Sequence, residues 1–177
     1  MLRSAEAADL PGILAVIKEG RRRIRALGID QWSGGYPGAA EFQEDIARGR
    51  CWVVSDKQGI AAVTVVSMEP EEAYSDIQGA WLQTERRYGT IHRVAVADRS
   101  RGSGAAVALE NLAERLIRRA GGVSVRCDTH LGNQPMNRFL EKMGFTRCGI
   151  VVYPDIQVGD PVRVAYEKLL LSSERGE

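Results

Sequence analysis

Residues 90–122 read TIHRVAVADRSRGSGAAVALENLAERLIRRAGG, and the rest of the chain is arranged around this stretch. Ile91–Val96 is short, apolar and rich in β-branched residues, which predicts a β-strand. The apolar residues that follow recur at helical spacing as far as Ala120, and Gly121 suits the left-handed residue that ends such a helix. The stretch therefore predicts a strand, a loop of small residues and an amphipathic helix, in that order.

The loop between this strand and this helix has the features of an anion-binding site. The N–H groups in the first turn of a helix are unpaired, and the helix dipole favours negative charge there. Gly102 and Gly104 carry no Cβ, so a phosphate can approach the backbone closely. Two nucleotide loops do not fit, since this loop has no lysine and Val107 stands where a dinucleotide loop needs Gly or Ala.

Two motifs lie in and after this stretch. Arg101–Ala106 reads RGSGAA, and Asn133–Phe145 reads NQPMNRFLEKMGF. The first resembles the acyl-CoA loop of the GCN5-related N-acetyltransferases (GNAT), whose pattern is Gln/Arg-x-x-Gly-x-Gly/Ala. The second resembles the next motif of that superfamily, in which an Asn precedes a short helix and Gly-Phe opens a strand. The motifs occur in the family's order, and the other expected elements fit that order too.

The resemblance implies an activity and a set of cofactor contacts. It implies an acetyltransferase that uses acetyl-CoA as co-substrate. Backbone groups of Val94, Ala95 and Val96 would meet the pantetheine arm of CoA, as an added strand would. Asn133 would hydrogen-bond the same arm. The contacts to the pyrophosphate would be made by Arg99, Arg101, Gly102, Ser103, Gly104, Ala105 and Ala106.

The sequence departs from the family at the residue that would act as the general acid. Many members carry a Tyr four residues before the Gly of Gly-Phe, and this Tyr protonates the leaving thiolate. The corresponding residue here is Leu140, which has no proton to donate. Three alternatives remain: water supplies the proton, another group such as Tyr153 supplies it, or the thiolate leaves unaided.

His92 is the candidate general base. It has the same parity along the strand as Val94 and Val96, so its side chain is predicted to point to the same face. An ordinary His pKa of about 6.5 suits proton uptake at neutral pH. The alternative is a structural histidine beside the substrate channel.

The acceptor pocket is predicted in a turn-rich loop that follows the first helix. This loop contains Gln31, Trp32 and Tyr36, and its aromatic residues either anchor it to the core or line the pocket.

The acidic stretch Glu69–Glu72 has two interpretations. It is either a solvated turn or a site that attracts a cationic amine.

Length, charge and cysteine content limit the class of protein. The chain has 177 residues, a formal net charge of +1 and three widely spaced cysteines. A single GNAT-like domain over residues 1–171 and a flexible tail over 172–177 are expected. The near-neutral charge gives no overall field for nucleic acid or an anionic membrane, and no membrane partner is expected. The cysteine and histidine spacing predicts neither a metal site nor disulfides, which favours a cytoplasmic location.

The order of elements predicts an α/β (α+β) fold. We expect a mixed, mostly antiparallel sheet of six to seven strands with helices on both faces. Two function classes follow. The first is an N-acetyltransferase that transfers acetyl from acetyl-CoA to an amine of a small molecule or peptide by direct attack, with O-acetylation or a longer acyl donor as variants. The second is a non-catalytic acyl-CoA-binding module. The sequence does not decide between a monomer and a homodimer.

Overall fold

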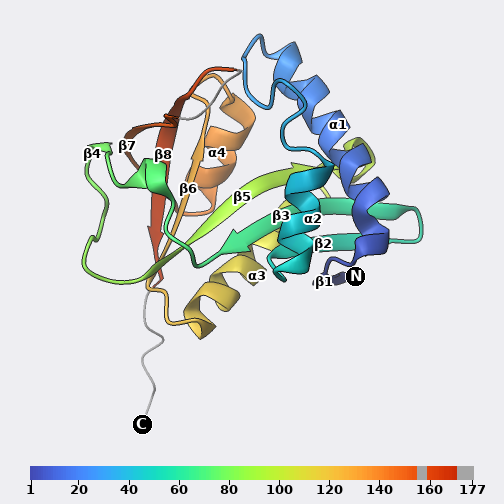
Figure 1. Ribbon diagram of the computed structural model, residues 1–177, viewed down its shortest axis with the longest axis horizontal. Coiled ribbons are helices and arrows are strands. Elements are labelled where there is room, and N and C mark those ends of the chain that lie inside the picture. The colour runs from blue at the N-terminus through green and yellow to red at the C-terminus, as the bar shows by residue number, and fades with distance from the viewer. Residues whose placement is uncertain (155–158, 171–177) are drawn as a thin grey trace.

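The computed structural model describes residues 1–154 and 159–170 (Figure 1). The predicted tail at residues 172–177 lies outside the described residues, as does the last residue of the predicted domain. The elements are β1 (Leu2–Ser4), α1 (Leu10–Ala26), α2 (Ala39–Ala47), β2 (Cys51–Asp56), β3 (Gly59–Ser67), β4 (Gln78–Gly79), β5 (Tyr88–Val96), α3 (Ala105–Arg119), β6 (Ser124–Thr129), α4 (Gln134–Lys142), β7 (Thr146–Val152) and β8 (Val162–Leu169).

Within the described residues, eight strands form one sheet in the order β1-β2-β3-β5-β6-β8-β7-β4. Neighbouring strands are antiparallel except for β5 and β6, which are parallel. The predicted mixed, mostly antiparallel sheet is confirmed, with one strand more than the upper end of the predicted range. The additional strand is β4, which pairs Gln78 with Ile150 and Gly79 with Gly149. Two residues are too few to show a strand period in the sequence.

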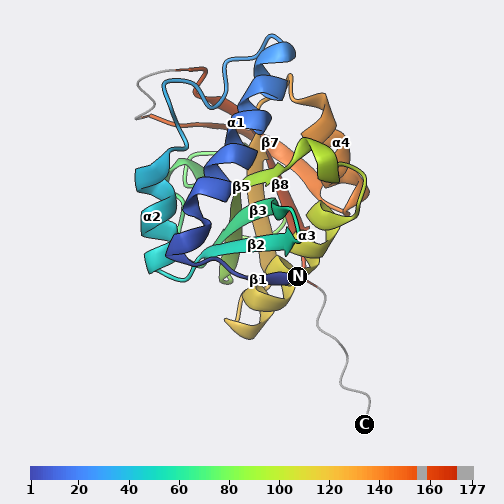
Figure 2. The same cartoon turned by 90° about the vertical axis from the view of Figure 1, so that its right-hand side faces the viewer.

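The four α-helices of the described chain cover both faces of the sheet. Figure 2 shows α1 and α2 on one side of the strands and α3 and α4 on the other. Under α1 and α2 the core includes Ile13, Ile17, Phe42, Val53 and Val65. Under α3 and α4 it includes Ala113, Ile117, Val125, Leu140 and Tyr166. Both faces of the sheet are therefore buried, as the prediction required.

Strands β5 and β6 pair over only part of their length. Their parallel pairing joins Tyr88–Thr90 to Ser124–Arg126. Strand β5 begins at Tyr88, earlier than the predicted start at Ile91, and the added residues supply this pairing. From Ile91 onward β5 lines a cavity whose other wall includes Cys127–Thr129 of β6. The centre of the sheet is thus split at the stretch that decides the fold.

A β-bulge in β5 changes which side chains share a face. The register places His92 opposite Val65 and Ala95 opposite Val63, and it shifts between these two pairs. Arg93 accommodates the extra residue with φ 55°, a positive value for a residue other than glycine. Since Val63 and Val65 share a face, His92 and Ala95 share that face too.

The bulge overturns the parity expected for His92. The prediction assumed an unbroken period of two along the strand, which would group His92 with Val94 and Val96. Val96 lies opposite Ala62 and packs with the α3 side of the sheet. His92 therefore faces away from Val96, because one inserted residue reverses the alternation.

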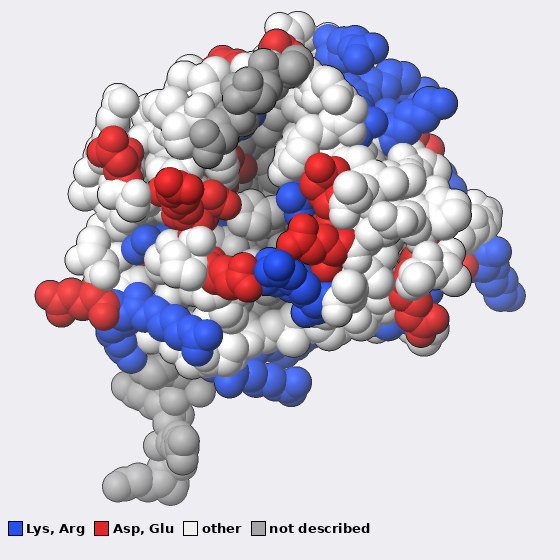
Figure 3. Space-filling view, in the orientation of Figure 1, with Lys and Arg blue, Asp and Glu red and all other residues white. Residues whose placement is uncertain are grey.

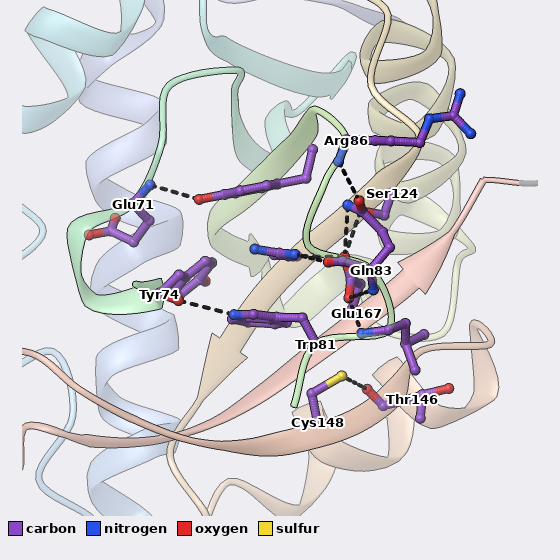
Figure 4. Close-up of polar contacts among 12 residues, drawn as sticks. Glu71, Tyr74, Trp81, Gln83, Arg86, Ser124, Thr146, Cys148 and Glu167 are labelled. Carbon is purple, nitrogen blue, oxygen red and sulfur yellow. Dashed lines mark hydrogen bonds and ion pairs between the residues drawn. The ribbon is translucent and has the colours of Figure 1, made fainter. Parts of the chain in front are cut away.

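The segment between β4 and β5 is fixed to the sheet by a buried ion pair. Arg126 Nε donates to Glu167 Oε1 at 2.9 Å, and the Arg126 guanidinium lies 4.1 Å from the ring centre of Trp81. The backbone N–H of Leu82 donates to Glu167 Oε2 at 2.6 Å. Figure 4 shows Gln83 and Ser124 also directed at Glu167. The segment is therefore anchored at several points.

Candidate active site

One cavity of about 950 Å³ runs through the split in the sheet. Its walls come from α1, the loop after α1, the start of α3, α4 and the parted strands β5 and β6. Figure 3 shows the face that carries α1 and α2, which is hollowed near its centre with acidic side chains at the margin. The cavity reaches both sides of the sheet because β5 and β6 are not paired there.

At one end of the cavity lies the glycine loop before α3. Gly104 is the N-terminal cap of α3 with φ 84°, and Gly102 has φ 76°. A Cβ at either position would meet no atom within 4 Å, so the space above the loop is open. The positive φ values favour glycine, and the open space allows an anion to reach the helix N-terminus.

Only part of the predicted phosphate-binding set lines this end of the cavity. The members that line it are Arg101, Gly102, Ala105 and Ala106. The Arg99 guanidinium is directed to the β2–β3 hairpin instead, where it donates to Asp56 Oδ2 at 2.5 Å and to the Ile60 carbonyl at 3.2 Å. The Ser103 hydroxyl accepts from the Ala105 N–H at 3.4 Å, within its own loop.

The residues predicted to contact the pantetheine arm also line the cavity. Val94, Ala95 and Val96 line it from the open edge of β5. Asn133 lines it from the opposite side, where its Oδ1 accepts from the Met136 N–H and caps α4. The chain thus offers a strand edge and a buried amide on facing walls.

The aromatic loop after α1 also lines the cavity. Gln31, Trp32 and Tyr36 all contribute to its wall. Trp32 also packs against the core under α1, so it both anchors the loop and lines the cavity. Tyr36 is 45% exposed, and its hydroxyl accepts from Arg93 Nη2 at 3.2 Å. The Oε1 atom of Gln31 is buried without a hydrogen-bond partner in the described chain.

His92 and Glu71 lie side by side in the cavity wall. Their Nε2 and Oε2 atoms are 3.7 Å apart. Burial lowers the pKa of His92 below 6.5, which keeps the imidazole neutral at pH 7. Burial also raises the pKa of the Glu71 carboxyl group. Glu71 belongs to the acidic stretch with two readings, and the structure places this residue in the cavity wall and partly buries it.

A second carboxylate, Asp128, lies near the end of β6. The hydroxyls of Tyr74 and Tyr153 each donate to its Oδ2 at 2.7 Å. Burial and the nearby Asp128 charge raise the pKa of the Tyr153 phenol. No role was predicted for Asp128 from the sequence. The sequence signal that could have identified Asp128 is its position at the end of a strand, shortly before the Asn133–Phe145 motif.

Leu140 and Glu110 lie on the α3 and α4 side of the cavity. Leu140 is buried and lines the wall with Phe139 and Met136. Glu110 lines the same wall from α3, and sequence reasoning did not single it out. Burial, followed by repulsion from Glu114, raises its pKa to about 7. The sequence signal for its burial is its helical spacing from Ala113 and Ile117, which lie on the apolar face of α3.

A family model described as the acetyltransferase (GNAT) family matches residues 21–145. The chain belongs to this family. A solved GNAT-family acetyltransferase from Streptococcus agalactiae is 35% identical, with a TM-score of 0.81, over 96% of this chain and 94% of the other. No curated sequence shows significant similarity.

More distant GNAT structures share the fold. The ribosomal-protein-alanine N-acetyltransferase of Brucella melitensis is 18% identical with a TM-score of 0.67, over 96% of this chain and 99% of its own. The NatC complex, solved with Gag peptide and CoA, includes a chain that is 16% identical with a TM-score of 0.66, over 97% and 98%.

Two further findings concern metals and membranes. Within residues 1–154 and 159–170, no cluster of three or more His, Cys, Asp or Glu side chains is placed to hold a metal ion. No helix in the same part of the chain has the length and apolar character needed to cross a bilayer.

Proposed function

We propose that this GNAT protein is an N-acetyltransferase that transfers acetyl from acetyl-CoA directly to an amine of a small molecule or peptide. The observation that carries the proposal is the continuous cavity. It connects a glycine loop at a helix N-terminus, which suits a diphosphate, to a group of carboxylates and a neutral histidine, which suits an amine. Both substrates can therefore meet without a covalent enzyme intermediate.

The residues along the cavity fit acetyl-CoA. Arg101, Gly102, Ala105 and Ala106 would hold the pyrophosphate, with Gly104 shaping the loop. The β5 edge at Val94–Val96 would pair with the amide-bearing arm, and Asn133 would support it from the opposite wall. Arg99 and Ser103 would act on the loop rather than on the phosphates, since their partners lie within the protein. When bound, acetyl-CoA supplies the thioester.

Proton transfer on the acceptor side would use the buried polar groups. The amine enters as an ammonium ion, which Glu71 and Asp128 attract. His92 takes its proton directly or through water, because burial keeps the imidazole neutral. The free nitrogen attacks the carbonyl carbon, the C–N bond forms, the C–S bond breaks, and the nitrogen gives up its second proton to water.

The leaving thiolate would take its proton from water. Leu140 has no proton to give, and the Tyr153 hydroxyl already donates to Asp128 with a raised pKa. Tyr153 and Tyr74 would then position Asp128 rather than act as acids. The acceptor would contact Gln31, Trp32 and Tyr36, whose loop closes this end of the cavity.

The cofactor assignment can be tested at Gly104. Gly104→Asp places a negative charge at the proposed diphosphate site, and Gly104→Asn has the same size and the same tolerance of positive φ. Calorimetry should show that the Asp variant binds acetyl-CoA more than tenfold more weakly than the Asn variant, as expected for a charge effect of about 1.4 kcal/mol or more. Equal affinities would contradict the assignment.

The second candidate function is a non-catalytic acyl-CoA-binding module, and Leu140 is the observation that favours it. Incubating the protein with acetyl-CoA, an amine library and a thiol reagent separates the two. Amine-dependent release of CoA thiol supports the enzyme. Acetyl-CoA binding without release supports the module. Trp32→Ala then identifies the acceptor end, since it should raise the KM of the amine far more than that of acetyl-CoA.

The remaining proposals concern domain organisation, location and oligomeric state. We propose one domain over residues 1–171 and a cytoplasmic location, the latter because cysteine usage suits a reducing compartment. A homodimer is compatible with this assignment, and sedimentation of the purified chain would establish the oligomeric state.

A further inference from the structure

Glu110 is a buried carboxyl group that the chemistry above does not use. It lies on α3 with 5% of its surface exposed and contributes to the cavity wall. Its Oε1 atom is buried and has no hydrogen-bond partner among the described residues. The nearby Lys168 ammonium is hydrogen-bonded to Glu114. A buried polar atom without a partner is unfavourable unless something else satisfies it.

The position of Glu110 is defined by the helix that carries it. Ala106 and Glu110 are one turn apart on the same face of α3, and both line the cavity. At about 1.5 Å per residue, Glu110 lies roughly 6 Å further along the helix than Ala106. Cys127, Phe139 and Leu140 belong to the apolar cluster that also holds Ala113, one turn from Glu110, and they offer little hydrogen bonding. Glu110 therefore lies beyond the proposed diphosphate site, in an otherwise apolar section.

We propose that the Glu110 carboxyl group binds an amide of the pantetheine arm of acetyl-CoA. A protonated carboxyl group has one O–H donor and one free acceptor, and a secondary amide offers the complementary C=O and N–H. Such a pair satisfies the orphaned Oε1 atom and a polar part of the arm that the apolar wall leaves unpaired. This role rests on the proposed use of acetyl-CoA.

The charged groups around Glu110 favour its neutral form. Glu114 of α3 repels a second negative charge, and Lys168 of β8 opposes that effect only in part. The Cys127 thiol of β6, which also faces it, has a pKa raised well above its usual value and is uncharged. A bound arm excludes water and further disfavours the carboxylate, so binding should draw a proton onto Glu110.

The first test compares acetyl-CoA affinity in two variants by calorimetry, with no acceptor present. Glu110→Met keeps an apolar wall and removes the hydrogen bonds, whereas Glu110→Gln keeps a donor and an acceptor. The Met variant should bind roughly 5- to 10-fold more weakly, the loss expected for about one hydrogen bond. The Gln variant should bind nearly as well as the parent. ADP, which lacks the arm, should bind equally to all three.

The second test follows the proton. The acetyl-CoA affinity of the parent should fall as pH rises from about 6.5 to 8.5, since the carboxylate that forms cannot donate. The Gln variant should lose that part of the pH dependence. Calorimetry in buffers with different ionisation enthalpies should show more proton uptake for the parent than for the Gln variant. This comparison needs only the conservative variant and stands even if the Met variant does not fold.

Each outcome bears on one claim. If the parent does not bind acetyl-CoA, the proposed cofactor is wrong and this role is wrong with it. If the parent binds acetyl-CoA but all variants match it in affinity and proton uptake, only the role of Glu110 is wrong. If the Met variant loses ADP and acetyl-CoA to the same extent, the effect does not come from the arm, and the proposal is again wrong.

Discussion

His92 shows how a single inserted residue sets the chemistry available to a side chain. The bulge at Arg93 turns His92 to the face it shares with Ala95, where it lies beside Glu71 in the cavity wall. Burial there lowers its pKa, so the imidazole is neutral at pH 7 and loses its ability to accept a proton only in more acidic solution. The rate should therefore fall with acid below pH 6.5.

We predict that His92→Gln lowers kcat by about 10² to 10⁴, the usual contribution of a general base. Acetyl-CoA affinity should stay close to that of the parent, and the acid limb of the kcat/KM profile below pH 6.5 should disappear. Steady-state kinetics across pH measures both. Glu71→Gln is the matched control for the neighbouring carboxyl group. A His92→Gln enzyme with full activity and the same limb would make His92 structural.

Glu110 gives a second prediction at this scale, which concerns stability. Its pKa rises from 4.5 to about 7, so between these values the native state holds a proton that the unfolded state has lost. Stability then falls as pH rises through this window, by roughly 3 kcal/mol at about 1.4 kcal/mol per unit. Glu110→Gln should be more stable than the parent near pH 8 and similar near pH 5. Urea unfolding at both pH values measures this, and an equal difference at both would contradict it.

At the scale of elements, the segment between β4 and β5 depends on the pair Arg126–Glu167. This segment carries Trp81, whose indole N–H donates to the Tyr74 carbonyl at 3.0 Å (Figure 4). Tyr74 in turn donates to Asp128 in the cavity. The ion pair therefore supports the cavity wall at Asp128 through contacts within the protein.

We predict that Arg126→Met destabilises the protein by about 3–5 kcal/mol, because it leaves the Glu167 carboxylate buried without its cation. The double variant Arg126→Met/Glu167→Gln should recover much of the loss, since no uncompensated charge remains. Denaturant unfolding gives the energies, and limited proteolysis should cut the single variant within residues 75–88. Equal stability of the single and double variants would show that the charge is not the cause.

At the scale of the molecule, the sheet consists of two halves joined by a short parallel pairing. Strands β1, β2, β3 and β5 form one half, and β6, β8, β7 and β4 form the other. The pairing covers Tyr88–Thr90 and Ser124–Arg126, and beyond it the cavity separates the strands. A ligand in the cavity would contact both halves and stabilise their relative position.

We predict that saturating acetyl-CoA raises Tm by roughly 5–10 °C, since a ligand at 100 times its Kd adds about 2.7 kcal/mol to a domain of this size. Hydrogen exchange should slow along Ile91–Val96 and Cys127–Thr129 together. Calorimetry and exchange measure the two effects, and both should be smaller in the control Gly104→Asp at the same acetyl-CoA concentration. Protection confined to α3 would contradict a ligand that spans the split.

The order and type of the main elements follow from the sequence because they depend on local periodicity. The strand–loop–helix stretch and the Asn–helix–Gly-Phe motif predicted the GNAT family, and the family match confirms it. The two-residue strand β4 was missed, since a pairing of two residues has no period and depends on the close approach of Gly79 and Gly149. Boundaries such as the start of β5 at Tyr88 depend on a partner strand that the local sequence does not name.

The candidate site divides in the same way. The sequence by itself determined the residues of the glycine loop, the aromatic loop and the missing tyrosine at Leu140, since each is a local pattern. Only the tertiary structure decided that Arg99 turns to the hairpin, that Glu71, His92 and Asp128 line one cavity, and that Glu110 is buried in its wall. The direction, burial and charge of a side chain depend on neighbours from distant segments, and a bulge or a split sheet brings those neighbours together without leaving a periodic signal.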